Sequence, residues 1–150
     1  MNWLIFSVIT QFIFIIYFSI THWIPLFPWN DIRKEGIFKA ERIGVVVHNI
    51  LQIFSISSYY MEWKPGMWVG LIYWSILFTF HILEWWIVYF FGWPTFFVKT
   101  TKEASATTYK FLPPIKNHPI PDACHFFIGI LAISVVISIY IYNFYFLFHS

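Results

Sequence analysis

The sequence predicts an all-α integral membrane protein: one domain built as an antiparallel bundle of four transmembrane helices, with both termini on the non-cytoplasmic side. Three observations lead to this prediction. The 150 residues are 59% hydrophobic and 11% charged, whereas a soluble domain carries roughly 25% charged residues. Four apolar segments each have the length needed to cross a bilayer, about 20 residues. The positive charges are concentrated in two of the three connections between these segments.

The first apolar segment, residues 3–20, has no Lys or Arg before it and no small-residue cleavage pattern, so we expect a membrane helix rather than a cleaved signal peptide. The second and third segments, residues 43–61 and 67–91, are joined by a connection that ends in Pro65-Gly66. Pro-Gly is a turn signal, which predicts a helical hairpin. The fourth segment is residues 123–148. All four are expected as helices, because lipid leaves the edges of an open sheet unsatisfied.

The other two connections, residues 21–42 and 92–122, are long and contain several prolines. A connection of about 30 residues is often functional in a compact domain. In the second of them we expect a short surface helix at residues 100–110. The proline-rich stretch at residues 110–122 has an extended path that suits either a rigid lid over a pocket or a stiff connector.

Eight of the nine Lys and Arg residues lie in the two long connections, and the remaining one, Lys64, lies in the hairpin turn. The positive-inside rule therefore places both long connections in the cytoplasm and the termini outside. We expect a multi-pass protein of a bacterial cytoplasmic membrane, with the lipid bilayer as its main partner and a homo-oligomer as an option. The net charge of +2 and the lack of a basic run argue against a nucleic-acid partner.

Polar residues are grouped in the cytoplasmic half of the predicted bundle. In the third segment, Glu84 follows His81 by one helical turn, and a charge at this depth is costly unless it faces the protein interior and has a partner. Polar positions on the neighbouring segments predict one interior pocket that opens to the cytoplasm. We expect its walls to be formed by His48, Asn49, His81, Glu84 and His125, and its mouth by Glu41, Arg42 and Asp122. Gln52 and Tyr73 lie on the same helical faces and are further candidate ligand-binding residues.

Two chemical interpretations fit these residues. Histidines and carboxylates on facing helices hold divalent metal ions in helical bundles, and the candidate metal ligands are His48, His81, Glu84, Asp122 and His125. Alternatively, Glu84, His81 and His48 carry out acid–base catalysis on a lipid-soluble substrate without a metal. Structural roles are also open: Glu84 pairing with a histidine or Arg42, His48 and Asn49 as interhelical hydrogen-bonding groups, and Asp122 as a helix N-cap.

The functional prediction is a small polytopic membrane protein with a cytoplasm-facing His/Glu pocket for a metal ion or a small lipophilic ligand, with a membrane-embedded enzyme as one option. The first alternative is a non-catalytic accessory, immunity or stress-response protein that acts through a partner. The second is an oligomeric transporter or channel. Cys124 is the only cysteine, so no intramolecular disulfide can form, and we expect it as a small residue at the membrane boundary.

Overall fold

The structure, a computed structural model, describes residues 2–32 and 39–149, with side chains described at 2–32 and 42–146. It is 75% helix and has no strand in these ranges. Four helical spans are long and apolar enough to cross a membrane, which confirms the predicted all-α class with four membrane-length helices. They are α1 (Trp3–Trp23), α2 (Lys39–Tyr60), the continuous run of α3 (Lys64–His81), η1 (Ile82–Ile87) and α4 (Val88–Phe91), and α6 (Ala123–His149).

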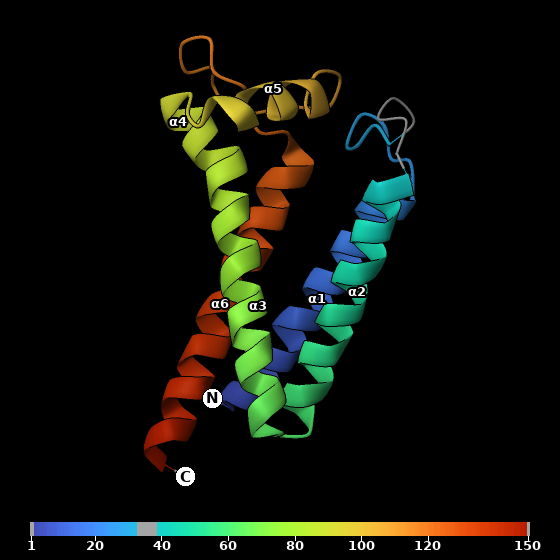
Figure 1. Cartoon of the computed structure of the whole chain (residues 1–150). Helices are drawn as coiled ribbons and strands as arrows, with labels where there is room; N and C mark the ends of the chain where they lie inside the picture. The colour runs from blue at the N-terminus through green and yellow to red at the C-terminus, as the bar shows by residue number, and fades with distance from the viewer. Residues whose placement is uncertain (1, 33–38, 150) are drawn as a thin grey trace.

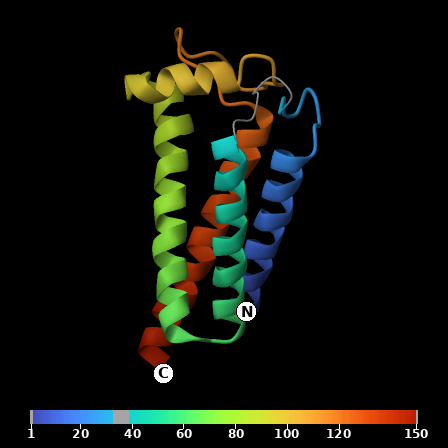
Figure 2. The ribbon, with the colours of Figure 1, turned by 45° about the vertical axis from the view of Figure 1, so that its right-hand side comes forward.

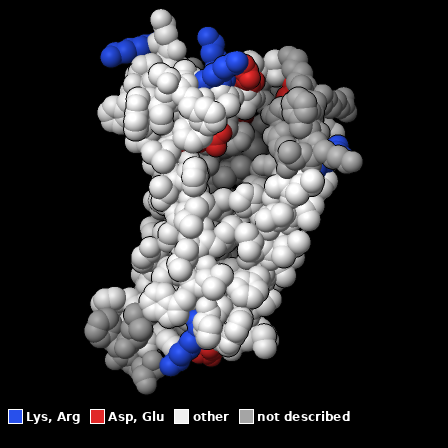
Figure 3. Space-filling view, viewed as in Figure 1, with Lys and Arg blue, Asp and Glu red and all other residues white. Residues whose placement is uncertain are grey.

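The four spans form a ring of neighbours. α1 packs against α2 and α6, and α3 packs against the same two helices. Both termini and the tight α2–α3 turn lie at one end of the bundle (Figure 1). At the other end, α5 (Thr95–Ala104) lies across the bundle rather than along it (Figure 2). Lys, Arg, Asp and Glu gather at these two ends and leave a white band between them (Figure 3), as expected for a chain whose middle contacts lipid.

Local sequence explains where the helices begin and end. The Asn2 carboxamide accepts hydrogen bonds from the N–H groups of Leu4 and Ile5, at 3.2 and 3.4 Å, and so caps the start of α1. Gly92 ends α4 with a φ of 67°, a left-handed conformation that glycine adopts at little cost. A Cβ at this position would lie 2.8 Å from the His118 imidazole, so the close approach of that side chain also requires glycine.

The short helix near the bundle end differs from the prediction. It spans Thr95–Ala104 instead of residues 100–110. Pro94 directly precedes it, and the fixed φ of proline favours a helix start. The chain leaves the helix at Ser105, and the next hydroxyl side chains bond to carboxylates: Thr107 donates to Asp31 at 2.7 Å and Thr108 donates to Asp122 at 2.8 Å.

Polar side chains hold the centre of the bundle together. The Gln11 side-chain oxygen accepts hydrogen bonds from Ser55 (2.6 Å) and from the Trp74 indole (3.1 Å), and these contacts join α1, α2 and α3. Thr10 and Ser138 share a hydrogen bond of 2.9 Å between α1 and α6. Apolar burial does not drive association within lipid, so close packing and interhelical hydrogen bonds of roughly 1 kcal/mol each do much of this work.

Candidate ligand pocket and metal-ligand cluster

Two adjoining cavities lie near the α5 end of the bundle. The outer cavity, here called the outer chamber, has a volume of about 740 Å³, and the inner chamber has a volume of about 470 Å³. Four residues line both chambers, so the two meet at these side chains: His22, Glu84, Trp85 and His125. On the face seen in Figure 3, a hollow opens near this end of the molecule with acidic atoms at its edge.

The two chambers have different chemical character. Polar groups from the α1–α2 connection, from α5 and from the turn after α5 line the outer chamber, among them Asn30, Asp31, Thr100, Glu103 and Thr107. The inner chamber lies between all four spans and has mostly apolar walls, formed by Phe14, Phe18, Leu51, Ile76, Leu77, Phe80, Ile128 and Ala132. Its polar wall residues beyond the shared four are His48, Tyr73 and His81. A molecule that filled both chambers would therefore meet a polar end and an apolar end.

The junction between the chambers is built on η1, a π-helical turn inside the third span. Its residues Ile82–Ile87 carry Glu84 and Trp85. π-helical turns are rare and occur frequently at functional sites. The Thr101 hydroxyl of α5 donates to the Glu84 backbone carbonyl at 2.9 Å. This contact fixes α5 against η1, so the helix that forms part of the outer chamber's wall is bonded directly to the turn that carries the junction residues.

The Glu84 carboxylate lies at this junction. The sequence leaves open a structural pair of Glu84 with a histidine or with Arg42. Within the described ranges, no hydrogen bond or ion pair reaches the Glu84 carboxylate, although His125 is near enough to influence it electrostatically. Arg42 is exposed and lines neither chamber. Glu84 lines both chambers, so a ligand in either chamber would be next to this side chain.

His125 is held firmly on the opposite side of the junction. Its backbone N–H and its Nδ1 both donate to Oδ1 of Asp122, at 2.9 and 2.7 Å. Its ring stacks on the Trp85 indole with a centroid separation of 3.6 Å and an interplanar angle of 16°. An Nδ1–H that donates to a carboxylate leaves Nε2 as the acceptor of the neutral ring. The arrangement therefore presents an oriented imidazole to both chambers.

Asp122 is both the N-cap of α6 and the group that orients His125. It is 1% exposed, and its second oxygen accepts a hydrogen bond from Thr108 at 2.8 Å. Burial by itself raises the pKa of this carboxyl, but the hydrogen bonds from His125 and Thr108 and the charge of His125 outweigh burial, so the pKa is lowered. Asp122 is therefore ionised at neutral pH.

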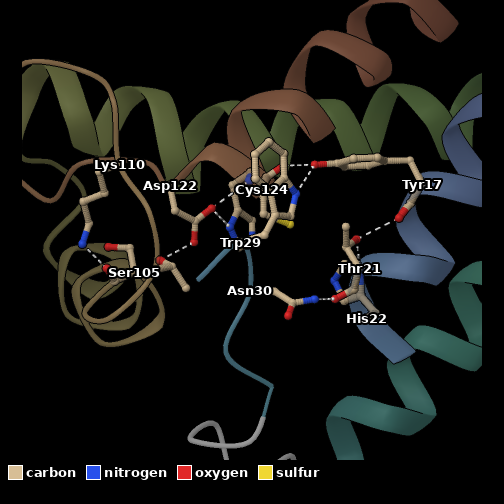
Figure 4. Close-up of polar contacts among 11 residues, drawn as sticks. Tyr17, Thr21, His22, Trp29, Asn30, Ser105, Lys110, Asp122 and Cys124 are labelled. Carbon is tan, nitrogen blue, oxygen red and sulfur yellow. Dashed lines mark hydrogen bonds and ion pairs between the residues drawn. The ribbon is translucent and has the colours of Figure 1, made fainter. Parts of the chain in front are cut away.

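Cys124 completes a compact group with these two residues. One carboxylate oxygen of Asp122, the Cys124 Sγ and one ring nitrogen of His125 all lie within 4.8 Å of one another. The Tyr17 hydroxyl donates to the Cys124 backbone carbonyl at 3.3 Å, and the Trp29 indole donates to the Tyr17 hydroxyl at 2.9 Å (Figure 4). In the part of the chain that the structure describes, no other group of three or more His, Cys, Asp or Glu residues comes as close.

The metal-ligand set expected from the sequence is only partly brought together. Asp122 and His125 belong to the compact group, whereas His48, His81 and Glu84 do not. These three line the inner chamber from α2, α3 and η1. The His48 Nδ1 lies 3.2 Å from the Tyr73 hydroxyl. His81 is buried against α6, and its Nε2 has no hydrogen-bond partner among the described side chains and backbone.

Two further expected site residues, Asn49 and Gln52, line neither chamber. The Asn49 side-chain oxygen accepts a hydrogen bond from Ser19 at 3.4 Å, which joins α2 to α1. Gln52 is fully buried and makes no well-formed hydrogen bond to a described residue. The Glu41 side chain lies outside the described residues. The proline-rich stretch 110–122 does not line the outer chamber, whose wall on this side comes from residues of α5 and the turn after it.

Three residues at the site were not identified from the sequence: His22, Trp85 and Cys124. His22 lines both chambers. The signal was present, because His22 follows the buried Phe14 and Phe18 at helical spacing and so shares their face. Cys124 stands between Asp122 and His125 in the sequence, and this proximity to two candidate ligands was the available clue.

No protein family, curated protein or solved structure matches this chain.

Proposed function

We propose that this integral membrane protein binds a small lipophilic molecule that has one polar end, with its apolar part in the inner chamber and its polar end at the junction. The observation that carries the proposal is the set of four residues shared by the two chambers, His22, Glu84, Trp85 and His125. Ligand pockets are typically about 300–1,000 Å³, mostly apolar, and contain a few positioned polar groups. The inner chamber and its junction have this composition.

The junction also suits acid–base chemistry on the bound molecule. Glu84 and His125 come from different helices and have different surroundings, since His125 is hydrogen-bonded to Asp122 and Glu84 has no such bond to another described side chain. Two titratable groups with separate environments on either side of a ligand are the basis of proton transfer. A membrane-embedded isomerase or hydrolase of a lipophilic substrate is the enzymatic form of this proposal.

The proposed orientation places the chambers on the cytoplasmic side of an antiparallel bundle. Lys99 and Lys102 lie on α5, and eight of the nine Lys and Arg residues belong to the two long connections of the sequence. The positive-inside rule assigns these connections, and with them the end that carries α5, to the cytoplasm. The termini would then face outside. A bacterial cytoplasmic membrane is the proposed location. The polar end of a ligand would reach the junction from the cytoplasm through the outer chamber.

A larger side chain placed in the inner chamber tests whether the chamber holds a lipophilic molecule. Leu77 lines this chamber, whereas Ile72 is 58% exposed on the same helix and does not. We expect Leu77→Trp to lower the amount of lipophilic molecule that stays with the purified protein in native mass spectrometry, because the indole occupies the space. Ile72→Trp is the matched control and should retain the wild-type amount. Equal retention in wild type and both variants would overturn the proposal and would favour a protein that acts through a partner.

A further inference from the structure

We propose that Asp122, Cys124 and His125 form a binding site for a zinc-class divalent cation at the start of α6. The three donor atoms lie within 4.8 Å of one another. Asp122 and Cys124 are buried, and His125 is partly buried. The site differs from the set of histidines and carboxylates in the inner chamber, and it does not depend on whether the chambers hold a lipophilic molecule.

The donor set matches the chemistry of zinc. A thiolate, an imidazole nitrogen and a carboxylate oxygen are the three ligand types that Zn²⁺ uses in proteins. The thiolate disfavours Mg²⁺ and Ca²⁺, which prefer oxygen ligands. With metal–ligand bonds of about 2.0–2.3 Å, the ligand atoms of a tetrahedral site lie about 3.3–3.8 Å apart. No donor pair is more than 4.8 Å apart, so the widest pair has to close by at most about 1.5 Å to surround an ion, and the hydrogen-bonded Nδ1–Oδ1 pair, at 2.7 Å, has to open by about 0.6–1.1 Å.

Contacts around the cluster hold each ligand near this arrangement. The Thr108 hydroxyl bonds to Asp122, and the Ala123 N–H donates to the Tyr109 carbonyl at 2.8 Å, which anchors the first turn of α6. The imidazole of His125 is stacked on Trp85. Outer contacts of this kind orient metal ligands and raise metal affinity. The Cys124 thiol releases its proton on binding. An ion held by both Asp122 and His125 replaces the Nδ1–H···Oδ1 hydrogen bond between them: it binds Nδ1, and the neutral imidazole then carries its proton on Nε2.

The fourth coordination position would face the outer chamber. Cys124 and His125 line this chamber, and Glu84 lies on its wall. Catalytic zinc sites typically have three protein ligands and leave the fourth position to water or substrate. An ion at this cluster would therefore have a water-accessible position close to the junction where His125 and Glu84 meet the inner chamber.

Cobalt binding tests the site directly. Co²⁺ is added to the full-length protein in detergent after EDTA treatment. We expect one equivalent to give the intense near-ultraviolet absorption of a cobalt–thiolate bond, which Zn²⁺ then displaces. Cys124→Ser should lose this absorption, and His125→Gln should weaken binding at least about tenfold. His118→Gln removes a histidine of the same end that is not in the cluster, and it should leave the titration unchanged.

A measurement on the wild-type protein tests the metal site even if a variant fails to fold. In zinc-loaded wild type, X-ray absorption should show one sulfur ligand at about 2.3 Å. Folded wild-type protein that gives no cobalt–thiolate absorption, or a zinc shell without sulfur, would overturn the proposal. Leu77→Trp should leave the cobalt spectrum unchanged, and Cys124→Ser should still retain the lipophilic molecule. Failure of the metal site and failure of the ligand pocket are therefore separate results.

Discussion

Asp122 accepts two hydrogen bonds from His125 through one carboxylate oxygen, from the backbone N–H at 2.9 Å and from the imidazole at 2.7 Å. The first bond caps α6, and the second fixes the ring that lines both chambers. One side chain thus connects the start of a membrane span to the orientation of the proposed site. Each role predicts a separate effect of substitution.

Removal of the Asp122 side chain should destabilise the protein. Asp122→Ala loses the cap and leaves the Thr108 hydroxyl without its acceptor, so we expect a loss of about 1–3 kcal/mol in the free energy of unfolding. Asp122→Asn retains an oxygen that can cap the helix, and it should lose less. Thermal denaturation in detergent, followed by circular dichroism, measures the difference. An alanine variant as stable as the wild type would contradict the assigned role.

The same carboxylate predicts an acid dependence. The pKa of folded Asp122 is lowered, so its contribution to stability is present above the unfolded value of about 3.9 and is lost as the pH falls through the folded pKa. The stability difference between wild type and Asp122→Asn in metal-free protein should therefore shrink as the pH falls below about 4. A difference that stays constant from pH 7 to pH 3 would show that the charge of Asp122 contributes nothing.

Gly129 should be required for the contact between the third span and α6. A Cβ on Gly129 would lie 2.9 Å from the His81 Nε2 and 3.0 Å from the Trp86 Nε1. Gly129→Ala should force both side chains to move and cost about 1–3 kcal/mol of stability. Gly44→Ala is the control, because no atom lies within 4 Å of its added Cβ, and alanine favours a helix by up to about 1 kcal/mol. Equal melting temperatures for the two variants would refute this packing.

The polar contact at the bundle centre predicts a stability effect far from the site. Gln11→Leu removes the acceptor of Ser55 and one of the two acceptors of Trp74, whose indole also donates to Ser55 Oγ at 3.1 Å. Both donors are fully buried, so we expect a loss of about 1–2 kcal/mol. Ser134→Ala removes a hydroxyl that bonds only to its own helix and should have little effect. Unfolding in a denaturing detergent compares the two, and an unchanged Gln11→Leu would contradict the interhelical role.

The sequence predicts the spans well because length and hydropathy determine them locally. The polar positions His48, His81, Glu84 and His125 also stand out, since polar groups turn away from lipid. The structure places these four on the wall of the inner chamber. The sequence provides no comparable signal for Trp85, because an aromatic residue suits both lipid and the protein interior. Its position depends on the π-helical turn η1.

Other features depend on how distant segments meet. The compact group of Asp122, Cys124 and His125 requires the particular start of α6, where the connection after α5 supplies Thr108 and Tyr109. Glu84 lines the space between the spans instead of bonding to a described side chain of a neighbouring helix. Hydropathy reports the preference of each residue for lipid or water, and it does not specify which faces leave a space between them.

The most direct test of the proposed pocket is photo-crosslinking with two long-chain alcohols, one with a diazirine beside the hydroxyl and one with a diazirine at the chain end. We expect the alcohol with the diazirine beside the hydroxyl to label the peptides around Glu84, Trp85 and His125 at the junction. The alcohol with the diazirine at the chain end should label inner-chamber residues such as Phe14 and Ala132. Leu77→Trp should abolish the second pattern. Labelling confined to lipid-facing positions such as Ile72 and Ile137, with both reagents, would contradict a ligand pocket inside the bundle.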